Sequence, residues 1–205
     1  MKIYTLADYE ASGIISANQR AIIESAIDRR ENALIVGETK AGKTTLLNAI
    51  LEYIARQSPN ERVVLLEDTV ELQARNANLV QLRAMEGSYE INDLLKDALR
   101  LRPDFLCIGE VRGKEALTFI KALWTGHPGA CTVHASTALA GLRRVESMIQ
   151  EASVTPQRSQ IAEAINLVIV IRRDEKRPAK RAVTEIVRVK STLSDGDYDM
   201  ENPLA

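Results

Sequence analysis

A segment whose residue types bind phosphate follows a short apolar run near the start of the chain. It reads GETKAGKT over residues 37–44 and matches the pattern G-x-x-x-x-G-K-[ST]. The apolar run 33–36 before it and the helical pattern 44–56 after it supply the strand and the helix that such a loop joins. Backbone N–H groups would surround the β- and γ-phosphates, Lys43 would place a positive charge on them, and the Thr44 hydroxyl would bind Mg²⁺. We therefore expect ATP and Mg²⁺ to bind through Gly37, Glu38, Thr39, Lys40, Ala41, Gly42, Lys43, Thr44 and Thr45.

Two residues of this loop work against tight binding of nucleotide. Lys40 stands where glycine is common, and a positive φ there would cost about 1–2 kcal/mol. Glu38 would bring a carboxylate near the phosphates unless its side chain points outward. Neither residue removes the groups that do the chemistry. The guanine-recognition motif Asn-Lys-x-Asp does not occur in the sequence, so a GTPase is not expected.

Carboxylates follow two further apolar runs that have the character of buried strands. Glu67 and Asp68 end the run that starts at Arg62, and Glu110 ends the run 105–109. In a parallel sheet both strand ends open on the edge that carries the phosphate loop. Hydrolysis needs one carboxylate to orient or deprotonate water and another to support Mg²⁺. We expect Glu67 and Glu110 to be catalytic, with Glu110 holding Mg²⁺ through water, although Asp68 could substitute for Glu67.

Strands and helices alternate along the chain and would position these side chains. Strand patterns cover residues 33–36, 62–67, 79–83, 105–109 and 130–134. Helical patterns cover 17–30, 44–56, 91–101, 115–124 and 137–151, and a further helix opens at Thr155-Pro156. Two β-rich runs, 166–173 and 182–190, would pair as a hairpin. This order predicts an α/β fold, a mostly parallel sheet with helices on both faces.

The composition excludes several classes of protein. The 205 residues suit roughly one domain. Lys plus Arg number 27 against 28 for Asp plus Glu, so the chain lacks the basic surplus of a dedicated duplex-DNA binder and no direct nucleic acid binding is expected. The longest apolar stretches are too short to span a bilayer, and the first ten residues lack the apolar core of a signal peptide. These features predict a cytoplasmic domain.

The motifs taken together resemble the secretion-ATPase superfamily, and in particular the conjugal-transfer ATPases of type IV secretion systems. Four motifs follow in the order of that family, and a fifth string has a conjugative character. They are the phosphate loop 37–45, the acidic box 67–72, the segment 99–113, the histidine box 125–135 and the string 140–146. The resemblance covers nearly all of residues 1–195.

This resemblance implies a RecA-like P-loop NTPase that hydrolyses ATP as the motor domain of a hexameric ring. ATP would lie between neighbouring subunits. The glutamates implicated in hydrolysis fall on Glu67 and Glu110, and the histidines thought to link the nucleotide to the next subunit fall on His127 and His134. Arg112, two residues after Glu110, is a further candidate for a phosphate or interface contact. A metal site at the two histidines is not expected, because no further histidine and no cysteine joins them.

The resemblance also implies the domain organisation and the cellular setting. Residues 1–195 would form the motor domain, with 1–36 as a lead-in segment and helix, and 196–205 would form an acidic tail. The family carries an additional N-terminal domain that supplies arginines to the γ-phosphate, and only 36 residues precede Gly37. We therefore expect the motor domain alone, with weak turnover. Its partners would be inner-membrane secretion components, so that the protein is cytoplasmic and peripheral at the inner membrane.

Two alternatives stay open beside a conjugation or type IV secretion motor that powers pilus assembly or substrate transfer. One is a type IV pilus or type II secretion ATPase. Many type II members carry a four-cysteine metal insert, which this chain with only Cys107 and Cys131 cannot form. The other is a nucleotide-binding assembly module without turnover, which Glu38 and Lys40 motivate. DNA and protein are both open as the transported substrate.

Overall fold

One eight-stranded sheet organises the part of the chain that the structure describes. The computed structural model describes residues 3–85, 87–152, 155, 158–193 and 195–204. The strands are β1 Ala33–Val36, β2 Arg62–Glu67, β3 Asn78–Arg83, β4 Phe105–Ile108, β5 Gly129–Val133, β6 Leu167–Arg173, β7 Arg181–Thr192 and β8 Tyr198–Glu201. Their order in the sheet is β3-β2-β4-β5-β1-β6-β7-β8. Neighbours from β3 to β6 are parallel, and β7 and β8 add to the edge as antiparallel strands.

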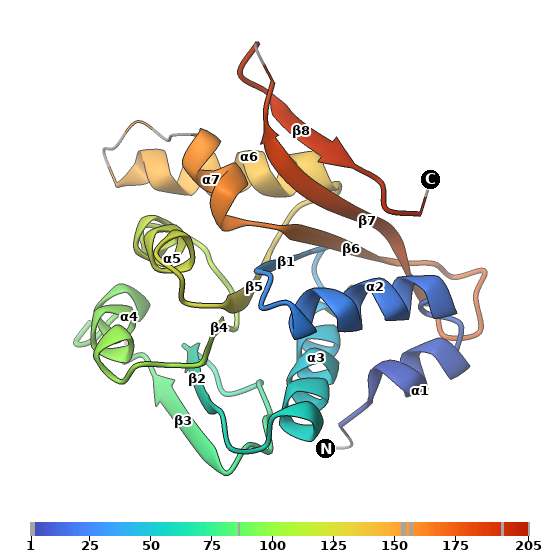
Figure 1. The fold of residues 1–205 in the computed structure, drawn as a ribbon, viewed down its shortest axis with the longest axis horizontal. Helices are drawn as coiled ribbons and strands as arrows, with labels where there is room; N and C mark the ends of the chain where they lie inside the picture. Colours follow the sequence, from blue (N-terminus) through green and yellow to red (C-terminus); the bar gives the residue numbers. More distant parts are fainter. Residues whose placement is uncertain (1–2, 86, 153–154, 156–157, 194, 205) are drawn as a thin grey trace.

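Helices cover both faces of this sheet (Figure 1). The first face carries α1 Leu6–Ala11, α2 Ala17–Asp28 and α3 Lys43–Gln57. The second face carries α4 Ile91–Arg100, α5 Glu115–Trp124, α6 Ala138–Glu151 and α7 Arg158–Ala164. The predicted α/β class, with a mostly parallel sheet between two helical layers, is confirmed. So is the predicted hairpin, since β6 and β7 pair antiparallel.

Each face of the sheet has its own apolar core, because successive side chains of a strand point to opposite faces. In β1, Leu34 and Val36 pack in the core under α4 to α7, whereas Ala33 and Ile35 pack in the core under α1 to α3. All four side chains are buried. The strand that leads into the phosphate loop is thus fixed from both sides, as a continuous apolar run predicts.

The parallel strands bring the chemically interesting segments to one edge. β1, β2, β4 and β5 run in the same direction and end at Val36, Glu67, Ile108 and Val133. The chain therefore leaves these strands at the same edge of the sheet, which is where ligands bind in open α/β sheets.

Three features differ from the sequence-based expectations. Helix α1 was not expected, because six residues are too few for a clear period, although Thr5 and Asp8 form a capping box at its start. Strand β5 ends at Val133, so His134 is the first residue after the strand. The expected helix start at Thr155-Pro156 lies partly outside the described residues, and α7 begins at Arg158.

The segment 196–205, expected to be an acidic tail, contains strand β8. Tyr198 is buried, and β8 pairs with β7 in antiparallel register. Glu201 forms an ion pair with Lys190 of β7. An edge strand buries only one face and tolerates carboxylates on the other, so its composition gives little strand signal. Of the helices in the described part of the chain, none combines the length and the apolar character needed to cross a membrane.

Candidate active site

The phosphate loop forms the turn between β1 and α3. Gly42 caps the helix with a φ of 103°, a left-handed conformation that favours glycine. A Cβ on Gly42 would also lie 2.6 Å from a guanidinium nitrogen of Arg181. A Cβ on Gly37 would lie 2.4 Å from the Ile171 carbonyl oxygen. The left-handed backbone thus favours glycine at position 42, and the close approach of a backbone carbonyl favours it at position 37.

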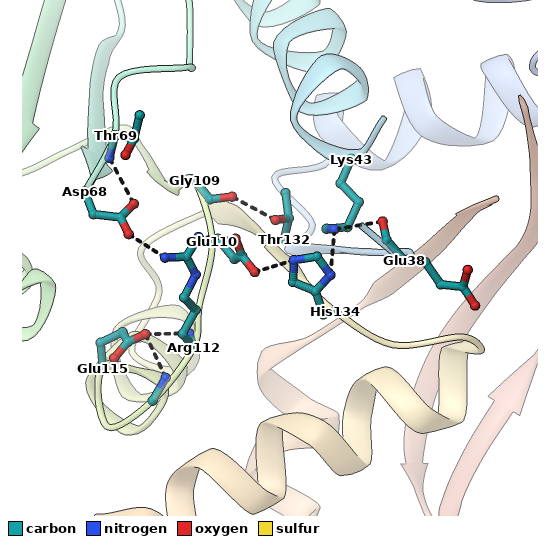
Figure 2. Close-up of polar contacts among 11 residues, drawn as sticks. Glu38, Lys43, Asp68, Thr69, Gly109, Glu110, Arg112, Glu115, Thr132 and His134 are labelled. Atoms are coloured by element: carbon teal, nitrogen blue, oxygen red, sulfur yellow. Dashed lines mark hydrogen bonds and ion pairs between the residues drawn. The ribbon is translucent and has the colours of Figure 1, made fainter. Parts of the chain in front are cut away.

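Lys43 lies at the centre of the site, at the first residue of α3, and its side chain is largely buried. Its ammonium contacts the Glu38 carbonyl oxygen at 3.3 Å and His134 Nδ1 at 3.2 Å (Figure 2). Burial lowers the pKa of Lys43, and the negative charge of Glu110 opposes that shift. In the described part of the chain, Lys43 thus contacts a carbonyl oxygen of its own loop and the imidazole that follows β5, and a phosphate could replace both contacts.

The conformations of Lys40 and Glu38 show how these two loop residues affect the binding of nucleotide. Lys40 has a φ of 62°, a left-handed conformation that costs a residue with a Cβ about 1–2 kcal/mol. Glu38 is exposed, and its carboxylate points away from Lys43 and His134 (Figure 2). The backbone of Glu38 thus belongs to the site while its charge faces away from the position of the phosphates.

A line of polar contacts, which we call the polar chain, runs from Lys43 along the sheet edge through His134, Glu110, Arg112 and Asp68. His134 Nε2 lies 2.7 Å from Glu110 Oε1. Glu110 Oε2 accepts a hydrogen bond from Arg112 at 2.7 Å, and Arg112 also donates to Asp68 Oδ2 at 2.6 Å. The polar chain joins the phosphate loop, the acid after β4 and the acidic box in one network (Figure 2).

The position of the imidazole proton follows from these contacts. An ammonium group only donates, so His134 Nδ1 accepts from Lys43 and the proton is on Nε2, which donates to Glu110. Burial and the positive charge of Lys43 lower the pKa of His134. Since an unperturbed histidine titrates near pH 6.5, His134 is neutral at pH 7. The unfolded chain takes up this proton more readily, so the stability that neutral His134 contributes is present above about pH 6.5 and declines as the pH falls below it.

The Lys43→Ala variant is expected to raise the pKa of His134, because it removes the positive charge beside Nδ1. The measurement is an NMR titration of the imidazole C–H signals. The chain has two histidines, and a His127→Asn variant assigns the two signals. A pKa of His134 that is the same in the Lys43→Ala variant and in the unaltered chain would contradict the contact between the two side chains.

Glu67 lies at the end of β2, as expected, but its carboxylate is engaged. The side chain is 3% exposed. Its Oε1 accepts from the amides of Glu71 and Leu72 at 2.9 and 2.7 Å, and Oε2 accepts from Gln81 Nε2 at 3.0 Å. A carboxylate bound in this way holds the backbone of the acidic box in place.

A small cavity of about 90 Å³ separates the acidic box from the phosphate loop. Thr44 lines it from α3, and it is otherwise lined by Glu67, Asp68, Thr69, Glu71, Gly109, Glu110 and Arg112. Glu71 was not among the expected site residues, yet it is exposed here and its charge acts on the pKa of Lys43. The signal that could have found it is its place as the third acid of the acidic box.

The next residue of the loop, Thr45, borders a different cavity. This second cavity measures about 710 Å³ and lies between α1 and the β6–β7 hairpin. Tyr9 and Ile14 line it on the α1 side, and Ala179 and Arg181 line it on the hairpin side. Consecutive threonines thus open toward an acidic cavity on one side and a partly aromatic cavity on the other.

His127 is not brought to this site within the chain. It lies in the turn between α5 and β5, where its backbone N–H donates to the Ala122 carbonyl oxygen at 3.1 Å. That turn precedes β5, so His127 lies at the amino ends of the parallel strands, whereas His134 lies at their carboxyl ends. Of the two histidines of the histidine box, the fold places His134 beside Lys43 and His127 elsewhere.

The acidic cavity fits the chemistry of Mg²⁺. The described residues contain no group of three His, Cys, Asp or Glu side chains that would form a ready-made metal centre. Mg²⁺ prefers oxygen ligands, keeps several waters and is held by one or two carboxylates together with phosphate oxygens. The Thr44 hydroxyl and the carboxylates of Glu71 and Glu110 around this cavity are a donor set of that kind.

Comparison with known proteins identifies relatives over almost the whole chain. The family model described as "Type II/IV secretion system protein" matches residues 2–194. A protein of Sinorhizobium fredii named "Probable conjugal transfer protein TrbB" is 43% identical over 202 residues, which are 98% of this chain and 61% of that protein. The "Conjugal transfer protein TrbB" of Rhizobium radiobacter is 42% identical over 92% of this chain and 58% of its own length. The chain thus spans about three fifths of the length of these relatives.

Solved structures share the fold. The VirB11 ATPase of the Brucella suis type IV secretion system, solved in complex with sulphate, superposes with a TM-score of 0.75 at 23% identity, over 89% of this chain and 54% of that one. The pilus retraction motor PilT with bound ADP gives a TM-score of 0.65 at 21% identity, over 98% of this chain and 54% of that one. These likenesses confirm the predicted RecA-like fold.

Proposed function

The chain belongs to the Type II/IV secretion system protein family, and from that premise we propose that it is the ATP-hydrolysing motor of a conjugation or type IV secretion machine. The observation that carries the proposal is the link from Lys43 through His134 to Glu110, at the edge where the phosphate loop meets the acidic cavity. It supplies a cation for phosphate and a carboxylate for hydrolysis in one connected site. The names of the relatives, which are conjugal transfer proteins, favour conjugation.

In the proposed mechanism the phosphates of ATP bind the Lys43 ammonium and replace its contacts with His134 Nδ1 and the Glu38 carbonyl oxygen. Loop amides from residue 37 to the start of α3 bind the β- and γ-phosphates. Thr44 would hold Mg²⁺ directly and Glu110 would hold it through water, and a bound ion would supply positive charge for the phosphate oxygens.

The same site supplies groups for the attacking water and for the nucleoside. Carboxylates at the wall of the acidic cavity orient or deprotonate the water. Asp68 and Glu71 are both exposed there, and Asp68 is paired with Arg112, so we assign the water to Glu71. His134 is released from Lys43 when ATP binds. Its contact with Glu110, and the contact of Glu110 with Arg112, couple this change to the rest of the polar chain. The nucleoside lies in the second cavity, beside Thr45.

We propose that the working form is a homo-oligomer, a hexameric ring with ATP between subunits. In this proposal residues 1–195 act as the motor domain, and His127 and Arg112 contact a neighbouring subunit. Docking on inner-membrane secretion components makes the protein peripheral at the cytoplasmic side of that membrane. No direct binding of nucleic acid is part of the proposal, because Lys plus Arg number 27 against 28 acids.

An assembly module that binds nucleotide without turnover is the second candidate. The strained Lys40, with its φ of 62°, is the observation that favours it. The two candidates differ in one measurement, the Mg²⁺-dependent release of phosphate from ATP by this chain. The proposed motor releases phosphate in Mg²⁺ and stops in EDTA, whereas the assembly module binds ATP and releases none.

A further inference from the structure

Two buried side chains hold the acidic box from opposite sides, and neither belongs to the phosphate loop or the polar chain. Glu67 holds it from β2 through the amides of Glu71 and Leu72. Asn48 holds it from α3, donating through Nδ2 to the Glu71 carbonyl oxygen at 3.0 Å and accepting at Oδ1 from the Gln73 amide at 2.9 Å. The backbone of Glu71 is therefore fixed at its N–H by one side chain and at its C=O by the other.

Both side chains are shielded from water. Glu67 is 3% exposed and Asn48 is 4% exposed. Hydrogen bonds to a buried carboxylate or amide leave an unpaired polar group behind when one partner is removed, which costs more than the same loss at the surface. Such bonds fix a loop in one conformation, and the conformation fixed here leaves the Glu71 side chain exposed at the wall of the acidic cavity.

Asn48 also ties this loop to the nucleotide end of α3. It follows Thr44 by four residues, so both side chains lie on the same face of the helix, about 6 Å apart along its axis. Thr44 lines the acidic cavity and Asn48 holds the residue that lines its other wall. A single rigid helix thus sets the distance between the hydroxyl proposed for Mg²⁺ and the carboxylate of Glu71.

We propose that Asn48 and Glu67 are positioning residues, which fix Glu71 at the acidic cavity so that its carboxylate can act on the attacking water. The inference rests on the proposed ATP hydrolysis and reassigns Glu67 from a water-activating carboxylate to a support for one. It predicts that Asn48 and Glu67 act on turnover only through Glu71.

The first test is a double-mutant cycle between Asn48 and Glu71. Asn48→Ala is expected to lower kcat for ATP about 10- to 100-fold with KM unchanged, because displacement of a catalytic group by about 1 Å can have an effect of this size. In a Glu71→Gln background the same substitution is expected to lower kcat no further, since the group that it positions is already inactive. Equal losses in both backgrounds would mean that Asn48 acts independently of Glu71, and would overturn the proposal.

A matched control comes from the next turn of α3. Glu52 is also buried, and it forms an ion pair with Arg56 at 3.0 Å. It lies 3.7 Å from Arg75, which is in the segment between β2 and β3 but follows the acidic box. Glu52→Gln is expected to lower thermal stability without a change in kcat. A fall in kcat equal to that of Asn48→Ala would show that any loss of contacts in the segment between β2 and β3 slows turnover, and would contradict a specific role for Asn48.

Two substitutions of Glu67 distinguish a positioning role from a role as general base. Glu67→Gln keeps an oxygen that can accept from the Glu71 and Leu72 amides, so a positioning role keeps kcat within about tenfold of the unaltered chain. Loss of a general base costs about 10²–10⁴ in turnover. Glu67→Ala removes the acceptor and is expected to lose turnover under either role. A Glu67→Gln variant as slow as Glu67→Ala would overturn the proposal.

Amide hydrogen exchange tests the positioning without any turnover. Asn48→Ala is expected to speed exchange of the Gln73 amide, which loses its acceptor, and to leave amides in the core strand β4 unchanged. Unchanged exchange at Gln73 would overturn the inference. Absence of Mg²⁺-dependent hydrolysis in the unaltered chain would instead overturn the proposed function, and the exchange result would still stand.

Discussion

A Lys43→Ala variant is expected to lose tight binding of ATP, by a factor on the order of 10²–10⁴. Lys43 is the buried cation of the phosphate loop, and its present contacts are a carbonyl oxygen and His134 Nδ1, both of which a phosphate oxygen can replace. A hydrogen bond to a charged group contributes about 1.5–3 kcal/mol, so two such bonds to phosphate account for a factor of this size. Equilibrium dialysis or titration calorimetry with ATP and Mg²⁺ measures it.

Loss of folding must be separated from loss of binding in this variant. Thermal unfolding of Lys43→Ala, recorded without nucleotide, shows whether the loop change destabilises the sheet. Lys121→Ala, on the exposed surface of α5, serves as the lysine control and is expected to bind ATP like the unaltered chain. ATP affinity of the Lys43→Ala variant equal to that of the control would refute the assignment of residues 37–45 as the phosphate-binding loop.

A Glu110→Gln variant is expected to bind ATP and to lose about 10²–10⁴ in turnover. Glutamine keeps the shape of the side chain but removes the charge that faces the acidic cavity and that accepts from His134 and Arg112. Binding survives because Lys43 and the loop amides remain. The measurement is kcat together with the dissociation constant for ATP in the same protein.

The matched carboxylate for this comparison is Glu90, an exposed residue whose partner is Lys114. It lies outside the polar chain, so Glu90→Gln is expected to leave kcat unchanged. Near-normal turnover in Glu110→Gln would remove Glu110 from the mechanism and leave the acidic-box carboxylates as the candidates at the cavity.

The sequence predicted the parts of the site that depend on local patterns. Residues 33–36 form a continuous apolar strand before a glycine loop, and this pattern placed Lys43 and Thr44 correctly at the start of a helix. The rule that parallel strands open at one edge also placed Glu67 and Glu110 near the loop. Lys40 stands where glycine is common, and the structure shows the positive φ that such a position allows.

The parts that the sequence did not predict depend on contacts between distant segments. His134 meets Lys43 because β5 is the neighbour of β1, an order that no local pattern gives. Asn48 reads as one polar residue within an amphipathic helix, and its role emerges only when the acidic box folds over α3. The burial of Glu67 depends in the same way on Gln81 of β3, fourteen positions away.

The central claim, that this chain hydrolyses ATP as one subunit of an oligomeric motor, is tested most directly by ATP hydrolysis in Mg²⁺ measured against protein concentration. The Lys43→Ala variant provides the blank. The account predicts phosphate release above this blank, with a specific activity that rises with concentration as shared sites form between subunits. Tight binding of ATP with no hydrolysis above the blank at any concentration would contradict it and favour a nucleotide-binding assembly module.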